Sequence, residues 1–111
     1  MAQRFDNIVV DIAKLRDYCL SDTHPRGRHK ARVFRSRLGI TARDARQLRQ
    51  AVLDAAHTLQ EDLRPAGADE FGQRYVLDFP MATATGTAMI RSAWIVLTGQ
   101  NVLRLSSCYV M

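Results

Sequence analysis

The segment AMIRSAWIVLTGQNVLRLSSCYV, residues 88–110, decides the fold, because it holds two apolar runs joined by a turn. The first run, 88–97, is rich in branched and aromatic residues, and Trp94 is expected in the core. Thr98-Gly99-Gln100-Asn101 has the composition of a hairpin turn, and 102–110 reads as the returning strand. The segment therefore predicts two antiparallel strands of one sheet.

A further strand is predicted upstream of this hairpin. Tyr75, Leu77 and Phe79 alternate with other residues, as in a half-buried strand. The stretch 64–69 contains a proline and a glycine and is expected to be a loop that ends the helical half. Near the N-terminus, 8–10 is either a short strand or an apolar lead-in to a helix. We expect a sheet of three to four antiparallel strands.

Helices are predicted at about 11–20, 27–38 and 42–61, from apolar residues at helical spacing. Asp11 and Thr41 are expected N-caps, and Gly39 is expected to end the second helix. The whole pattern predicts an α+β fold in which about three N-terminal helices pack on one face of an antiparallel sheet. We expect a single domain, 1–111, because 111 residues suit one core and no more.

Positive charge is concentrated in the first half of the chain. Residues 1–50 hold twelve Lys or Arg and five Asp or Glu, whereas residues 51–111 hold four and six. No acidic residue occurs from Thr23 to Arg43. Arginine outnumbers lysine 14 to 2, which favours bidentate recognition of phosphate or carboxylate. The window is interpreted either as a contact surface for a polyanion or as a solvated helix face.

The turn before the second helix, His24-Pro25-Arg26-Gly27-Arg28-His29-Lys30, is the densest group of chemically useful residues. Helix N-termini present unpaired N–H groups that bind phosphate, and Gly27 would let the backbone approach a ligand. His24 is a candidate general acid or base, and Lys30 a candidate for stabilising a phosphorane-like transition state. The alternative is that His24 and Pro25 only form a turn and cap the helix.

The last predicted strand carries hydroxyl groups at Ser107 and Tyr109 that could orient a phosphate. Strict alternation places both on the face of Leu103 and Leu105. The alternative is a strand hydroxyl with a partner and a packed tyrosine ring. Arg91, in the middle of an apolar strand, must lie at an edge, be paired, or face a ligand.

Several other chemistries lack sequence support. The chain contains no phosphate-binding loop, no dinucleotide-binding glycine motif, no zinc-binding pattern and no serine-hydrolase motif. We therefore expect no metal and no cofactor. The two cysteines, Cys19 and Cys108, fit reduced thiols in a cytoplasmic protein, and no apolar run is long enough to span a membrane.

Five blocks of the sequence follow a family pattern. They are KLRDYCL (14–20), HPRGRHKARVF (24–34), GQRY (72–75), RSAW (91–94) and SCY (107–109), where the pattern has Thr in place of Ser107. The chain thereby resembles a family of small bacterial domains of unknown function, found free-standing and as C-terminal modules of toxin-like proteins. The fold of that family resembles the barnase, EndoU and colicin-type ribonuclease group, which implies an RNase toxin. Its shared polar positions correspond here to His24, Lys30, Arg91, Trp94, Ser107 and Tyr109.

The leading hypothesis is a toxin-like domain that cleaves RNA without a metal ion. Its catalytic residues would be His24, Lys30, Ser107 and Tyr109, and its phosphate-binding residues Arg26, Arg28, Arg32 and Arg91. The first alternative is a non-catalytic module that docks on RNA or on an acidic cognate protein, such as an antitoxin or an immunity protein. The second is an interaction domain whose arginines only solvate its surface. We expect RNA as the partner, and no membrane.

Overall fold

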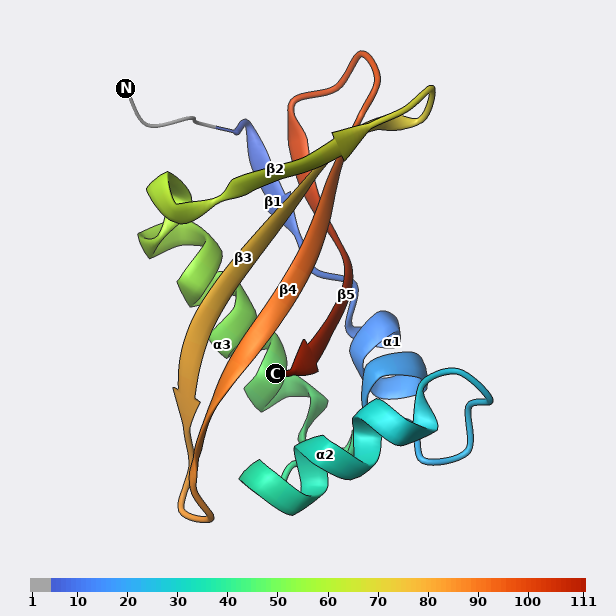
Figure 1. Cartoon of the computed structure of the whole chain (residues 1–111), viewed down its shortest axis with the longest axis vertical. Helices are drawn as coiled ribbons and strands as arrows, with labels where there is room; N and C mark the ends of the chain where they lie inside the picture. The colour runs from blue at the N-terminus through green and yellow to red at the C-terminus, as the bar shows by residue number, and fades with distance from the viewer. Residues whose placement is uncertain (1–4) are drawn as a thin grey trace.

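The computed structural model describes residues 5–111, which form a mixed α+β fold with one sheet (Figure 1). The strands are β1 (Asn7–Val9), β2 (Arg64–Ala68), β3 (Gly72–Ala82), β4 (Thr87–Leu97) and β5 (Val102–Val110). The helical elements are α1 (Ile12–Lys14), the π-helical turn η1 (Leu15–Cys19), α2 (Arg28–Leu38), α3 (Ala45–Thr58), and the 3₁₀ turns η2 (Ala42–Asp44) and η3 (Gln60–Asp62).

Within residues 5–111 the sheet has five strands in the order β1-β5-β4-β3-β2. The hairpin of β4 and β5 is confirmed, but two features of the predicted sheet are wrong. The sheet is mixed, because β1 precedes the helices and pairs in parallel with β5, with Ile8 opposite Leu103. The segment 64–68, predicted as a loop, is also a strand, β2, which pairs with β3 at the sheet edge. Pro65 has no backbone N–H, and an edge strand tolerates it because one of its sides has no neighbouring strand.

The predicted start of the first helix and the predicted end of the second are confirmed. Asp11 accepts a hydrogen bond from the Ala13 N–H at 2.9 Å, and Gly39 ends α2 with a φ of 67°. The first predicted helix is, however, two consecutive pieces, α1 and η1, and the third is three, η2, α3 and η3. The start of the third is the predicted one, because Thr41 and Asp44 form a capping box.

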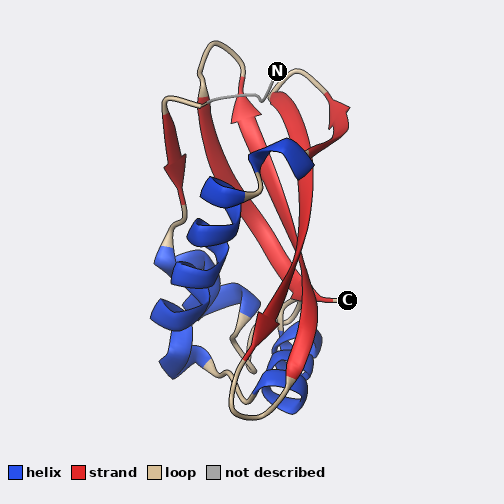
Figure 2. Ribbon diagram, turned by 90° about the vertical axis from the view of Figure 1, so that its left-hand side faces the viewer, coloured by secondary structure: helices blue, strands red, loops and turns tan. Residues whose placement is uncertain are grey.

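The core lies between the sheet and the helices. Figure 1 shows α3 running along one face of the sheet and α2 lying across the end at which β5 finishes, and Figure 2 shows the long helix against the strands from the side. Trp94, Phe34 and Leu48 are at most 1% exposed, so both helices and the sheet contribute to one apolar interior. The prediction that Trp94 is a core residue is confirmed.

A bulge in β5 changes the face on which its last residues lie. Ala93 pairs with Ser107, whereas the next residue, Trp94, pairs with Leu105, so Ser106 is an extra residue in β5. Beyond the bulge Cys108 takes the core side with Leu105. Ser107 and Tyr109 therefore lie on the opposite face, and the prediction from strict alternation is wrong because one inserted residue reverses the pattern.

Candidate functional site

The turn before α2 is built around the His24 side chain. Its Nδ1 accepts hydrogen bonds from the N–H groups of Arg26, at 3.0 Å, and Gly27, at 3.2 Å. A nitrogen that accepts an N–H must present a lone pair, so the imidazole carries its proton on Nε2. His24 thus forms the turn, as predicted, but it does not cap the helix, because both donors precede Arg28, the first residue of α2. Its Nε2–H is left as one donor to its surroundings.

Gly27 serves close packing within the chain. It is buried, and a Cβ atom added there would lie 2.1 Å from the carbonyl oxygen of Tyr18. The expectation that Gly27 gives a ligand access to the backbone is therefore corrected, because the missing side chain makes room for η1. This close approach brings Tyr18 beside the start of α2.

Tyr18 joins the two strongest candidates from the sequence. Its ring lies edge-to-face against His24, with centroids 4.8 Å apart, and the Lys30 Nζ lies 6.0 Å from its centroid. The same Nζ is 4.9 Å from the centroid of the Tyr109 ring on β5. His24 and Lys30 therefore both lie against Tyr18, and Lys30 also lies against Tyr109, although these residues come from a turn, a helix and the last strand. We call these four residues together with Ser107 the Lys30 cradle.

Ser107 belongs to β5, two residues before Tyr109. Its Oγ is buried and has no hydrogen-bond partner of acceptable geometry in the described part of the chain. Its polar neighbour is the Cys19 thiol, which is fully buried. The hydrogen bond between Cys19 and Cys108 is the main cause that lowers the pKa of Cys19 and raises that of Cys108. Lys30 lowers the pKa of both thiols, which places its charge near this corner.

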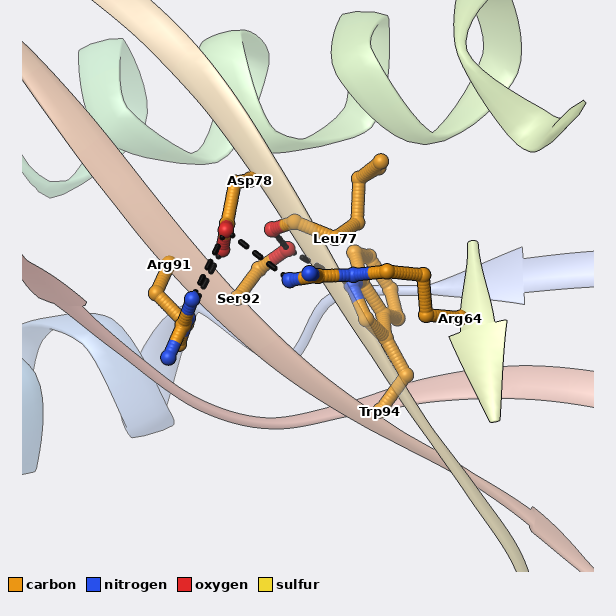
Figure 3. Close-up of polar contacts among 6 residues, drawn as sticks. All are labelled: Arg64, Leu77, Asp78, Arg91, Ser92 and Trp94. Carbon is orange, nitrogen blue, oxygen red and sulfur yellow. Dashed lines mark hydrogen bonds and ion pairs between the residues drawn. The ribbon is translucent and has the colours of Figure 1, made fainter. Parts of the chain in front are cut away.

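Arg91 is paired on the outer face of the sheet. Cross-strand register aligns Asp78, Arg91 and Tyr109 on β3, β4 and β5. The Nε and Nη2 atoms of Arg91 donate to the Asp78 carboxylate at 2.8 and 2.9 Å, and Arg64 donates to the same carboxylate at 2.9 Å (Figure 3). Asp78, and after it the Tyr109 hydroxyl, raise the pKa of Arg91. Arg91 thus links Asp78 to Tyr109 of the cradle, and the Asp78 carboxylate offsets much of the positive charge of Arg91.

The other predicted phosphate-binding residues divide between two places. Arg26 and Arg28 are exposed beside the His24 turn and make no ion pair with a described carboxylate. Arg32 lies on a different flank of α2 from Lys30, where it lines a separate pocket. Arg28 and Arg32 are four residues apart on α2, so they share the flank that faces away from Lys30, and the structure leaves both outside the cradle.

Sequence reasoning missed Tyr18 and Asp78 as members of this region. Tyr18 belongs to the first conserved-looking block of the family pattern, so the resemblance contained a signal for it. Asp78 carried a weaker signal. It is the acidic residue of β3, and alternation along the strand puts it on the outer face of the sheet, where Arg91 required a partner.

Neither a cluster of three metal-ligating side chains nor a membrane-spanning helix occurs in the described residues. Among residues 5–111, no three His, Cys, Asp or Glu side chains are grouped so that they could hold a metal ion. In the same range, no helix combines the length and the hydropathy needed to cross a membrane.

Comparison with known proteins supports the resemblance at the level of the family. No curated protein and no solved structure matches the chain. A family model described as "Domain of unknown function (DUF6883)" matches residues 2–111, nearly the whole sequence. The blocks that carry the pattern and the residues of the cradle all lie inside this match. The chain therefore belongs to the DUF6883 family of domains.

Proposed function

We propose that this domain binds RNA through the Lys30 cradle. The observation that carries the proposal is the position of the Lys30 ammonium group, 4.9 Å from the Tyr109 ring centroid and without an ion pair to any carboxylate in residues 5–111. A cation left unpaired beside aromatic rings and hydroxyl groups matches the needs of a nucleotide, which brings both a phosphate and a base.

The groups of the cradle divide these tasks. Lys30 would neutralise a phosphodiester, and the Nε2–H of His24 and the Tyr109 hydroxyl would donate hydrogen bonds to its oxygens. The half-buried rings of Tyr18 and Tyr109 offer surfaces for base stacking, which needs no particular sequence. Arg26, exposed in the turn itself, would hold a neighbouring phosphate.

Fluorescence anisotropy with a short, labelled single-stranded RNA tests this proposal. Lys30→Met should weaken binding, whereas Lys14→Met removes an exposed lysine of α1 and should leave binding unchanged. Equal binding by the wild type and Lys30→Met would exclude the cradle as the RNA site. Equal weakening by both lysine variants would instead indicate attraction by net charge alone.

Cleavage of the bound RNA is the second candidate. The contacts of His24 and Lys30 with Tyr18, and of Lys30 with Tyr109, favour it. In such a step O2′ attacks phosphorus, the bond from phosphorus to O5′ breaks, and a base takes the 2′ proton while O5′ gains one. With its proton on Nε2, His24 has no free lone pair for the 2′ proton. It becomes a base only in the other tautomer, which gives up both backbone hydrogen bonds to Nδ1.

The two candidates separate in one gel assay. Labelled RNA is incubated in EDTA with the wild type, with His24→Ala and with His24→Asn. Fragments from the wild type and none from either variant would establish cleavage that depends on the imidazole. Intact RNA in every lane, together with binding in the anisotropy assay, would leave the binding module and exclude cleavage of that RNA.

A further inference from the structure

A pocket opens on the flank of α2 that faces away from Lys30. It encloses about 320 Å³ between α2, η2 and the end of η1. In an α-helix, residue 32 lies about 200° and residue 35 about 140° around the axis from residue 30, on the far side of the buried stripe. The pocket is therefore separate from the Lys30 cradle, and it touches neither Tyr18 nor Tyr109.

The walls of this pocket combine an apolar floor with a cationic rim. The side chains of Leu20, Ala31 and Ile40, each at most 4% exposed, form the floor. Arg32, Arg35 and Arg43 form the rim, so α2 and the start of η2 supply its guanidinium groups. We call this cavity the arginine pocket.

The rim charges are not neutralised by the protein. Arg32, Arg35 and Arg43 make no hydrogen bond or ion pair with another side chain in the described residues. Asp22 also lines the pocket, and it is the acidic residue present there. Its carboxylate lies too far from the three guanidinium groups for an ion pair, so the pocket keeps an excess of positive charge.

We propose that the arginine pocket binds an organic phosphate monoester with an apolar or aromatic body, such as a nucleoside monophosphate. A monoester carries about 1.5 to 2 negative charges at neutral pH, which suits three arginines and one aspartate. Guanidinium groups bind phosphate oxygens in a bidentate manner. A single carboxylate carries less charge, and a small polycarboxylate has no apolar body to cover the floor. A free nucleotide and the terminal phosphate of an RNA share this chemistry.

Isothermal titration with adenosine 5′-monophosphate tests the proposal, with inorganic phosphate and adenosine as the two half-ligands. We expect the nucleotide to bind more tightly than inorganic phosphate, and adenosine to bind weakest. Arg35→Gln and Arg43→Gln should each weaken nucleotide binding by about tenfold, the effect of losing one charge-assisted hydrogen bond. Asp22→Asn should strengthen it, because the variant removes the opposing charge.

Two controls make the result specific to the pocket. Arg37→Gln removes an exposed arginine of the same helix that does not line the pocket, so it should leave binding unchanged. Ala42→Phe fills the pocket without altering charge and should abolish binding. Equal weakening by Arg37→Gln and Arg35→Gln, or unchanged binding by Ala42→Phe, would overturn the proposal. So would the absence of nucleotide binding at millimolar concentration.

A terminal RNA phosphate is distinguished from a free nucleotide by competition. A short RNA with a 5′-phosphate should displace the nucleotide from the wild type if the pocket accepts chain ends, and the same RNA with a 5′-hydroxyl should not. Displacement by neither RNA would assign the pocket to free nucleotides. Displacement by both would show that the pocket recognises internal phosphodiesters, against the proposal of a monoester.

Discussion

The Nζ of Lys30, on α2, lies 4.9 Å from the ring centroid of Tyr109, on β5, although the two residues are 79 positions apart in the sequence. This contact connects the basic helix to the sheet at the end where α2 packs on β5 (Figure 1). The Lys30 ammonium group has no carboxylate partner in residues 5–111. It lies next to Tyr109, whose hydroxyl helps to raise the pKa of Arg91.

Replacement of this lysine should change the salt dependence of RNA binding. If Lys30 neutralises one phosphate, Lys30→Met should reduce the slope of log affinity against log salt concentration by about 1. Lys14→Met provides the matched control and should keep the wild-type slope. A titration series from low to high salt measures both, and an unchanged slope for Lys30→Met would remove Lys30 from the interface.

His24 should contribute to stability as well as to the site. His24→Ala removes the acceptor of two backbone N–H groups and should lower the free energy of unfolding by about 1 kcal/mol or more. His24→Asn places an amide oxygen near the position of Nδ1 and should restore most of that loss, while it lacks the outer N–H donor.

Urea denaturation measures these differences, with His29→Ala as a control at an exposed neighbouring histidine. If His24→Ala is as stable as the wild type, the two hydrogen bonds to Nδ1 do not stabilise the turn. If His24→Asn is stable but fails to bind RNA, the outer N–H of the imidazole is required for the interaction.

Ser92 should be the most sensitive polar residue of the core. Its buried hydroxyl donates to the Leu77 carbonyl at 2.7 Å and accepts from the Trp94 indole N–H at 2.8 Å (Figure 3). Ser92→Ala leaves a buried donor and a buried acceptor without this partner, which should cost about 1 to 3 kcal/mol.

A double-mutant cycle with Trp94→Phe tests the reason for that cost. Trp94→Phe removes the indole donor, so Ser92→Ala should be less damaging in the Trp94→Phe background than in the wild type. Ser36→Ala, at an exposed position of α2, should be neutral. Strictly additive losses in urea denaturation would contradict an energetic coupling between Ser92 and Trp94.

The ion pairs of Asp78 should make the domain more stable at neutral pH than at acid pH. The hydrogen bonds from Arg91, and the charge of Arg64, hold the pKa of Asp78 below its ordinary value of 3.8. A carboxyl group whose pKa is lowered by folding stabilises the fold above its unfolded pKa, and that stability is lost as the pH falls through the folded pKa.

Asp78→Asn should therefore be less stable than the wild type near neutral pH, and the difference should shrink below a pH of about 4. Denaturation at several pH values measures this convergence. Asp62→Asn, which removes an exposed carboxylate without an ion pair in the described residues, should show little difference at any pH. A constant gap for Asp78→Asn would mean that its charge is not responsible.

The amino-acid sequence by itself determined the elements that depend on near neighbours. The 88–110 hairpin, the α2 stripe that ends at Gly39 and the Thr41–Asp44 cap follow from alternation, helical spacing and capping chemistry within a few residues. The same local signals identified the His24 turn and marked Lys30 as a candidate, because charge and turn composition can be read directly from the chain.

Only the tertiary structure decided how distant segments complete the sheet and the cradle. The short β1 strand and the proline-containing β2 strand exist because a neighbouring strand supplies their hydrogen bonds, which no local pattern reveals. The bulge at Ser106 reverses the face of Tyr109, and this reversal depends on the register with β4. Long-range packing thus brings Tyr109 to Lys30, which has no carboxylate partner in residues 5–111.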